Sequence, residues 1–159
     1  MSAETCVKML QEILDRKLKL MNTLLKLTEE QAGLINEDGL DQLGRVIAQK
    51  QKIIEAVDKL DEEFSVYFDM LKEKLDVTSL EQVKASDIEG ADRLKESVSK
   101  ILEVARAASE IDRENREKAD KLMEELSGSI KKIAGGKRAA SAYNPSPIQM
   151  PSYFIDKKK

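Results

Sequence analysis

The sequence predicts an all-α fold: an elongated antiparallel bundle of three long helices, with a short connecting helix and an extended C-terminal tail. Charged residues make up 36% of the 159 positions, aromatic residues make up only 4%, and all three prolines lie within residues 145–159. Through residues 1–134, apolar side chains recur at alternating steps of three and four, the period of an amphipathic helix. Helices accept this composition but not internal proline. We therefore assign residues 1–134 to the bundle and residues 135–159 to a flexible, proline-containing tail.

The first helix is predicted over residues 3–35. Its apolar residues follow a seven-residue repeat, at Cys6, Leu10, Ile13, Leu20, Leu24, Leu27 and Leu34. Further leucines broaden the stripe, as expected for a bundle helix that meets two neighbours. Residues 36–39 then break the period with side chains that favour caps and turns. A short break between long helices predicts an antiparallel hairpin.

The second helix is predicted over residues 40–75. Lys50 and Asp61 fall on its apolar stripe, and we interpret them as residues that fix the register of the bundle. The stem of Lys50 can also lie along the core while its charge stays in water. Phe64, Tyr67 and Phe68 are the only aromatic residues of the helical body, and core packing accounts for them better than a ligand pocket does.

A short connecting helix is predicted over residues 79–88, because Ser79 followed by Gln82 resembles a capping box. The chain is expected to reverse here, and the last helix is predicted over residues 91–133. Asp112 and Asn115 interrupt the apolar stripe of that helix. Beyond them the stripe holds larger apolar residues, namely Leu122, Met123, Leu126, Ile130 and Ile133. These five residues either bind a partner protein or close the core of the bundle itself.

The residue types argue against an enzyme. The chain has no histidine and one cysteine, so neither a Ser-His-Asp nor a Cys-His arrangement can form. A zinc site and a Glu-x-x-His di-iron site are excluded for the same reason. The carboxylates alternate with Lys and Arg at helical spacing, as around Arg113, which is typical of a solvated face. We expect no catalytic residues, no metal and no cofactor.

Charge and hydropathy bound the environment of the protein. The tail from residue 135 carries five basic residues and one acidic residue, which leaves a charge of −7 on the body. This distribution gives no reason to expect nucleic acid as a partner, and the basic residues are too few to hold a membrane surface. No apolar run approaches the roughly 18 residues of a membrane span, and no apolar signal segment begins the chain. Cys6 is expected to be a buried, inert thiol, so a cytoplasmic location is predicted.

Short motifs are spread over most of the chain. The body carries Leu24-Leu25-x-Leu27-Thr28-Glu29-Glu30-Gln31, Leu34-Ile35 before Leu40-Asp41-x-Leu43, Lys50-Gln51 and Leu60-Asp61. The tail carries the more specific motif, Lys137-Arg138-Ala139-Ala140-Ser141-Ala142-Tyr143. In these motifs, and in the order of three long helices followed by a tail, the chain resembles the FlgN-like flagellar type III export chaperones.

The resemblance implies a cytoplasmic bacterial chaperone that binds the C-terminal helical region of flagellar hook-filament junction (hook-associated) proteins. Such a chaperone keeps its substrates monomeric and delivers them to the flagellar type III export gate. Substrate binding in the family belongs to the C-terminal helix, which implies the binding residues Leu122, Met123, Leu126, Ile130 and Ile133. The tail tyrosine of the family matches Tyr143, which implies a contact with the cytoplasmic domain of the export-gate membrane protein.

Two other function classes stay open at this stage. In a self-assembling coiled-coil scaffold or adaptor, the end of the last helix would meet its own copy. An unbound chaperone can do the same, so a homodimer of the unbound chain does not separate the two classes. A basic-tailed nucleic-acid or membrane binder would instead show strongly salt-dependent binding that is lost with residues 135–159.

Overall fold

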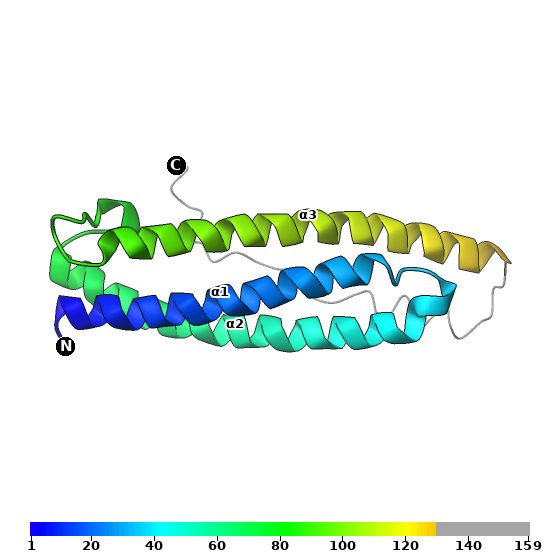
Figure 1. Cartoon of the computed structure of the whole chain (residues 1–159), viewed down its shortest axis with the longest axis horizontal. Coiled ribbons are helices and arrows are strands. Elements are labelled where there is room, and N and C mark those ends of the chain that lie inside the picture. The colour runs from blue at the N-terminus through cyan, green and yellow to red at the C-terminus, as the bar shows by residue number, and fades with distance from the viewer. Residues whose placement is uncertain (130–159) are drawn as a thin grey trace. The chain divides into compact units, whose positions relative to one another are not determined.

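The computed structural model describes residues 1–129, and every regular element in this range is a helix (Figure 1). The three long helices are α1 (Ala3–Ala32), α2 (Leu40–Leu75) and α3 (Ala91–Ser129). Two short 3-10 helices, η1 (Glu37–Gly39) and η2 (Leu80–Gln82), lie in the two connections. The predicted all-α class with three long helices is confirmed.

The described residues divide into two compact units, and each unit takes a segment of every long helix. The first unit contains Met1–Asn22 and Glu55–Ala105, and the second contains Thr23–Ile54 and the part of α3 from Arg106 onward. Within each unit, the α2 segment runs opposite to the α1 and α3 segments (Figure 1). Each unit is therefore a small three-helix bundle, in which every helix contributes one face to a shared core.

The core of the first unit is almost entirely apolar. Phe64 and Phe68 are buried with their ring centroids 5.5 Å apart, and Tyr67 beside them is half-buried. This arrangement agrees with the prediction that the aromatic cluster packs in the core. Cys6 is also fully buried, as expected of an inert thiol. The other buried apolar residues of this unit are Val7, Leu10, Ile13, Leu14, Met21, Val57, Leu60, Leu71, Val83, Ile88, Ala91, Leu94, Val98, Ile101 and Ala105.

The core of the second unit is smaller and mixed. Its buried apolar residues are Leu24, Leu43, Val46, Ile47, Ala108, Ala119, Leu122 and Leu126. The polar side chains of Thr28, Gln31, Lys50 and Asn115 are buried in the same unit. Buried polar groups destabilise a fold unless they have hydrogen-bond partners, so the stability of this core depends on how these four side chains are paired.

The first connection differs from the predicted one, because α1 ends at Ala32 rather than at residue 35. The amides of Gly33 and Leu34 donate to carbonyls three residues back, which closes the helix with a tighter turn. Asn36 is extended, and its side chain accepts a hydrogen bond from the Gly39 amide at 2.8 Å, which starts η1. A Cβ on Gly39 would lie 2.4 Å from the carbonyl oxygen of Leu34, so this turn requires glycine.

The second connection also differs, because only Leu80–Gln82 is helical where a helix over residues 79–88 was predicted. The Ser79 side chain makes no capping hydrogen bond, and Gln82 instead accepts from the Thr78 amide at 2.9 Å. The capping box that predicted a longer helix is therefore not formed. Val83 and Ile88 are buried and anchor the connection to the core of the first unit.

The end of the predicted last helix, residues 130–133, lies outside the described residues. The predicted site residues Ile130, Ile133 and Tyr143 and the predicted tail at 135–159 also lie outside them. Within residues 1–129, no helix combines the length and the apolar character that crossing a membrane requires.

Candidate partner-binding site

Three of the predicted binding residues lie together near the end of α3. Leu122 and Leu126 are one helical turn apart on the same face, and Met123 lies three residues before Leu126. We call these three residues the α3 strip. Leu122 and Leu126 are only 9% and 8% exposed, and Met123 is half-buried. The α3 strip therefore forms part of the core of the second unit, and a partner can contact its leucines only after they leave that core.

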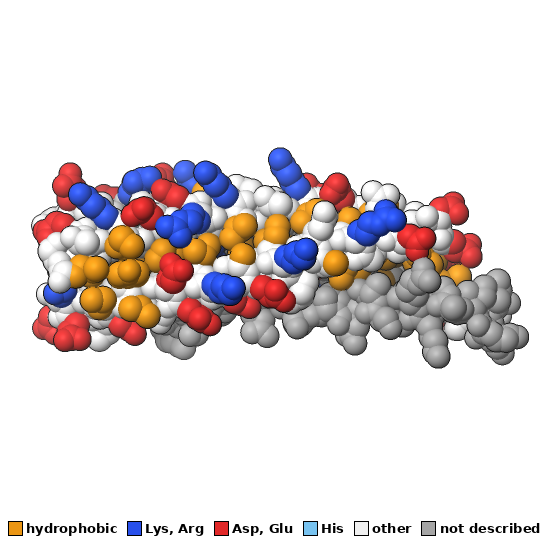
Figure 2. All heavy atoms as spheres, turned by 90° about the horizontal axis from the view of Figure 1, so that it is seen from below, with side chains coloured by type: hydrophobic (Ala, Val, Ile, Leu, Met, Phe, Trp, Pro, Cys, Tyr) orange, Lys and Arg blue, Asp and Glu red, His pale blue; other side chains and the backbone are white. Residues whose placement is uncertain are grey.

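Polar side chains flank the α3 strip on the solvent side. Asp120, Lys121 and Glu124 are all exposed. On the face that Figure 2 presents, which is seen from below Figure 1, acidic and basic side chains are interleaved and hydrophobic side chains gather between them. Mixed charge of this kind keeps the outer face of a helix in water and offers no large patch of one sign.

A layer of polar residues crosses the second unit upstream of the α3 strip. We define the polar layer by Thr28, Gln31, Lys50, Asp112 and Asn115. The ammonium of Lys50 donates to Oε1 of Gln31 and to Oδ1 of Asp112, both at 2.7 Å. Nδ2 of Asn115 donates to the backbone carbonyl of Thr28 at 3.0 Å. These contacts join α1, α2 and α3 to one another.

The polar layer fixes the alignment of the three helix segments. Lys50 is 7% exposed and Asn115 is fully buried, so sliding one helix past another would leave buried polar groups without partners. Lys50, which lies on the apolar stripe of α2, is thus paired with Gln31 and Asp112. It also brings Asp112 and Asn115, which interrupt the stripe of α3, onto the same layer.

A second buried ion pair lies in the first unit. Nζ of Lys17 is 2.5 Å from Oδ1 of Asp61, and their side chains are 3% and 16% exposed. Burial lowers the pKa of Lys17 from its ordinary value of 10.5, while the charges of Asp61 and Asp58 and the hydrogen bond to Asp61 oppose that shift. Asp61, which the sequence analysis interpreted as a residue that fixes the register, forms its ion pair with Lys17 of α1.

Lys17 and Gln31 were not identified from the sequence as buried polar residues, although the spacing of the apolar residues in α1 indicates their burial. Positions 10, 17, 24 and 31 are spaced by seven, and Leu10 and Leu24 are fully buried members of this row. A polar residue in a row of buried leucines indicates a buried polar contact. The seven-residue spacing does not identify the hydrogen-bond partners, Asp61 and Lys50, because they lie on α2.

The described residues hold no group of three or more His, Cys, Asp or Glu side chains placed to bind a metal ion. The exposed Arg113 contacts Glu110 at 2.6 Å and Glu117 at 3.5 Å, one turn away on either side. The hydrogen bond and the charge of Glu110, with the charge of Glu117, raise the pKa of Arg113. These groups pair along the helix surface as ordinary solvated ion pairs.

Comparison with models of protein families identifies the family of this chain. The model of a protein family described as FlgN protein matches residues 1–147, which include the three long helices, the α3 strip and the tail motif that ends at Tyr143. No curated protein and no solved structure matches the chain.

Proposed function

Because this chain belongs to the FlgN family of flagellar export chaperones, we propose that it binds the C-terminal helical region of hook-filament junction proteins. It keeps these proteins monomeric and delivers them to the flagellar type III export gate in the bacterial cytoplasm. The observation that carries the proposal is the α3 strip, which places large apolar residues beyond the polar layer and within the matched part of the chain.

Substrate binding then proceeds by exchange of helix contacts. Leu122 and Leu126 are buried, so the end of α3 gives up intramolecular contacts and regains equivalent ones against the substrate helix. Each leucine contributes about 1.5–3 kcal/mol when fully buried, and this contribution is nearly the same in either setting. The net affinity therefore comes from the additional apolar area that the substrate covers, which suits a complex that must later release its cargo.

The polar layer supports this exchange by limiting how much of α3 moves. Asp112 and Asn115 hold α3 to the other two helix segments through Lys50 and Thr28. Between Asn115 and Gly128, the buried residues of α3 are Ala119, Leu122 and Leu126, all apolar. The segment that follows the polar layer can therefore separate without breaking a buried hydrogen bond of that layer.

The first prediction concerns Leu126. Leu126→Asp should abolish capture of a junction protein in a pull-down, because a carboxylate cannot enter an apolar helix interface. Ser127→Asp adds the same group at the adjacent exposed position and should bind normally. Far-UV circular dichroism of both variants checks that the helices persist, and Met123→Glu repeats the test at a half-buried position. Capture by a folded Leu126→Asp variant would exclude the α3 strip as the binding site.

The second prediction concerns the tail. Tyr143 belongs to the matched part of the chain and lies outside the described residues. Tyr143→Ala should leave junction-protein capture unchanged and weaken binding to the cytoplasmic domain of the export-gate membrane protein, measured by calorimetry with purified components. If both affinities fell together, Tyr143 would belong to the substrate site and not to a gate contact.

A homodimer of the unbound chain would use the same exchange, with a second copy in the place of the substrate helix. Sedimentation velocity with and without a junction protein separates this chaperone from a self-assembling scaffold. A chaperone exchanges its homodimer for a heterodimer, whereas a scaffold keeps its own oligomer.

A further inference from the structure

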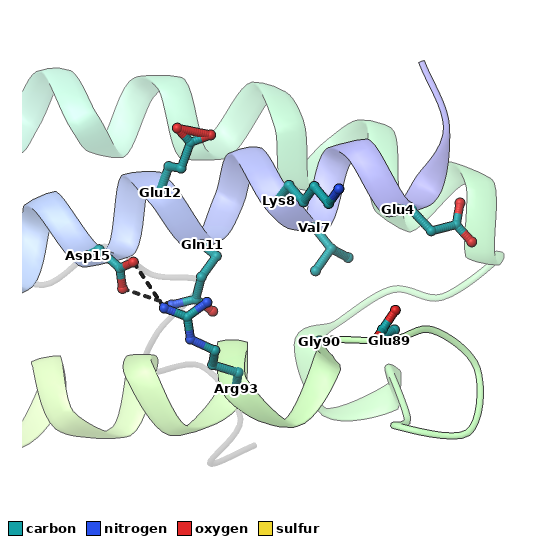
Figure 3. Close-up of a pocket in the computed structure, with 9 residues that line it drawn as sticks. All are labelled: Glu4, Val7, Lys8, Gln11, Glu12, Asp15, Glu89, Gly90 and Arg93. Carbon is teal, nitrogen blue, oxygen red and sulfur yellow. Dashed lines mark hydrogen bonds and ion pairs between the residues drawn. The ribbon is translucent and has the colours of Figure 1, made fainter.

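A pocket of about 490 Å³ lies in the first unit, between the start of α1 and the turn that opens α3. Its volume is within the range of about 300–1,000 Å³ that holds drug-sized ligands. Figure 3 shows Val7 and Gln11 directed from α1 toward the Gly90 turn and α3, and Arg93 directed back from α3 toward Asp15. The pocket belongs to the first unit, whereas the α3 strip belongs to the second.

One wall of the pocket holds a hydrogen-bond acceptor that has no donor. Gln11 is 6% exposed, and its Oε1 contacts no donor among the residues that the structure describes. The amide orientation is fixed, because Nε2 donates to Oδ1 of Asp15 at 3.0 Å and to Oγ of Ser97 at 2.9 Å. Exchanging the two amide atoms would place Oε1 against a carboxylate oxygen. A buried acceptor without a donor destabilises the fold unless a ligand supplies the donor.

Arg93 occupies the space beside this acceptor. Its guanidinium contacts Oδ2 of Asp15 at 3.2 Å, while Gln11 contacts the other oxygen of the same carboxylate. The Arg93 side chain is 66% exposed, and exposed ion pairs of this kind contribute little to stability. An incoming guanidinium can therefore take the place of Arg93 on Asp15 and donate a hydrogen bond to Oε1 of Gln11.

The charge of the pocket favours a cation. Its lining carries four carboxylates, from Glu4, Glu12, Asp15 and Glu89, against two basic groups, from Lys8 and Arg93. Within residues 1–129, the carboxylates of Glu4, Glu12 and Glu89 form no ion pair. A guanidinium also suits a carboxylate such as Asp15 better than an ammonium does, because it is more weakly hydrated and its planar fork matches the carboxylate oxygens.

The dimensions favour a peptide segment over a small ion. Lining residues extend along α1 from Glu4 to Asp15, which is about 16 Å at 1.5 Å per residue. An extended chain covers that distance in about five residues. Gly90 lines the pocket close to Val7, because its backbone has φ +94° and a Cβ there would lie 2.9 Å from Cγ1 of Val7.

We propose that this pocket binds an arginine side chain on an extended segment of a partner protein, with Gln11 Oε1 and Asp15 as its hydrogen-bond acceptors. In the unbound chain Arg93 contacts Asp15 but not Gln11 Oε1, so it competes with the partner for the carboxylate alone. The site does not depend on the assignment of the α3 strip, because no residue is shared between them.

The test uses the full-length chain and the capped pentapeptide acetyl-Ala-Ala-Arg-Ala-Ala-amide, titrated and followed by NMR. Signals of the Val7 methyls, the Gln11 side-chain amide and the Gly90 amide should shift together. A version with neutral citrulline in place of arginine should produce no shift at these signals. If citrulline or free arginine binds as tightly as the peptide, or if these signals do not move, the proposal is wrong.

Matched variants sharpen the test. Arg93→Ala should tighten peptide binding about twofold to fivefold by removing the competitor, whereas Arg106→Ala, at an exposed position of the second unit, should not. Gln11→Met should weaken binding roughly tenfold, whereas Ser97→Ala removes a neighbour of the amide but keeps the acceptor and should bind normally. Glu89→Gln should weaken binding more than Glu103→Gln at an exposed site outside the pocket. Unchanged binding by Arg93→Ala, or equal losses for the two glutamate variants, would overturn the proposal.

Discussion

A lysine ammonium lies within the core of the first unit. Lys17 is 3% exposed, and its carboxylate partner Asp61 is more accessible, at 16%. A buried ion pair is weak support for a fold, because desolvation of the two charges offsets much of their attraction. Its stronger effect is on specificity, because any packing that separates the two groups leaves a charge in an apolar core. The same reasoning applies to Lys50 in the polar layer.

The third prediction follows from this pair. Asp61→Ala leaves the Lys17 charge without its main partner and should lower the free energy of unfolding by about 3–5 kcal/mol. The double variant Lys17→Met/Asp61→Leu removes both charges and should unfold within about 2 kcal/mol of the wild type, or above it. Urea denaturation followed by circular dichroism measures both variants. A double variant as unstable as Asp61→Ala would show that the pair itself stabilises the core.

The pH dependence of this difference has a defined sign. Burial lowers the pKa of Lys17 below 10.5 in the folded chain, with Asp61 and Asp58 as the charged groups that oppose it. Between the lowered pKa and 10.5, the unfolded chain binds more protons than the folded chain. The stability of the wild type relative to the double variant should therefore rise as the pH increases through that window, and a fall would contradict the burial effect.

At the scale of the elements, a glycine directly precedes the start of two long helices, α2 and α3. Gly39 closes the turn before α2 against the backbone of Leu34, and Gly90 opens α3 with a left-handed φ of +94°. Gly44 lies in the interior of α2, with no atom within 4 Å of where its Cβ would be. A glycine inside a helix costs about 0.5–1 kcal/mol relative to alanine, so the same substitution has opposite effects at these positions.

The fourth prediction compares these glycines. Gly44→Ala should raise the free energy of unfolding by about 0.5–1 kcal/mol, because it restricts the unfolded chain and meets no neighbour. Gly90→Ala should lower it by about 1–3 kcal/mol, because alanine is strained at that φ and its Cβ would crowd Val7. Gly39→Ala should also be destabilising, because the obstructing atom belongs to the backbone. Thermal denaturation of the three single variants measures the order of their stabilities. A stabilising Gly90→Ala would contradict the described turn.

Much of this architecture could be predicted from apolar periodicity, because α2 spans Leu40–Leu75 and α3 begins at Ala91, where the periodic pattern changes. The end of α1 could not, because Leu34 and Ile35 continue the apolar pattern past the turn that closes the helix at Ala32. The pairing of Lys17 with Asp61 could not either, because periodicity places a residue on a face without naming its neighbour on another helix. The burial of Leu122 and Leu126 is likewise a tertiary property, since the same stripe would serve a partner or a core.

At the scale of the whole molecule, the two units divide the core unequally. Among residues 1–129, the first unit holds most of the buried apolar side chains, including both buried phenylalanines, whereas the second combines a smaller apolar set with the polar layer. Local opening is easiest where few apolar contacts are lost. The smaller apolar core of the second unit therefore favours the exchange of helix contacts that we propose for the end of α3.

The fifth prediction concerns this difference. Backbone amides of α3 after Asn115 should exchange with deuterium faster than those of the same helix between Leu94 and Ile101, because the latter belong to the larger core. Binding of a junction protein should slow exchange after Asn115 and leave the earlier segment unchanged. Mass spectrometry of peptic fragments measures both segments in one experiment. Uniform exchange along α3 would show that its end does not open separately.

The fully buried thiol of Cys6 has a practical consequence for experiments on this protein. The chain has no other cysteine, so a thiol-specific alkylating reagent can modify only this one thiol. Because solvent does not reach Cys6 in the folded chain, labelling requires that the start of α1 separate from the rest of the first unit. The rate of alkylation under native conditions therefore reports the rate of this local opening, and no engineered probe is needed. Run with and without cargo, it reports whether loading at the end of α3 disturbs the opposite end of the sequence.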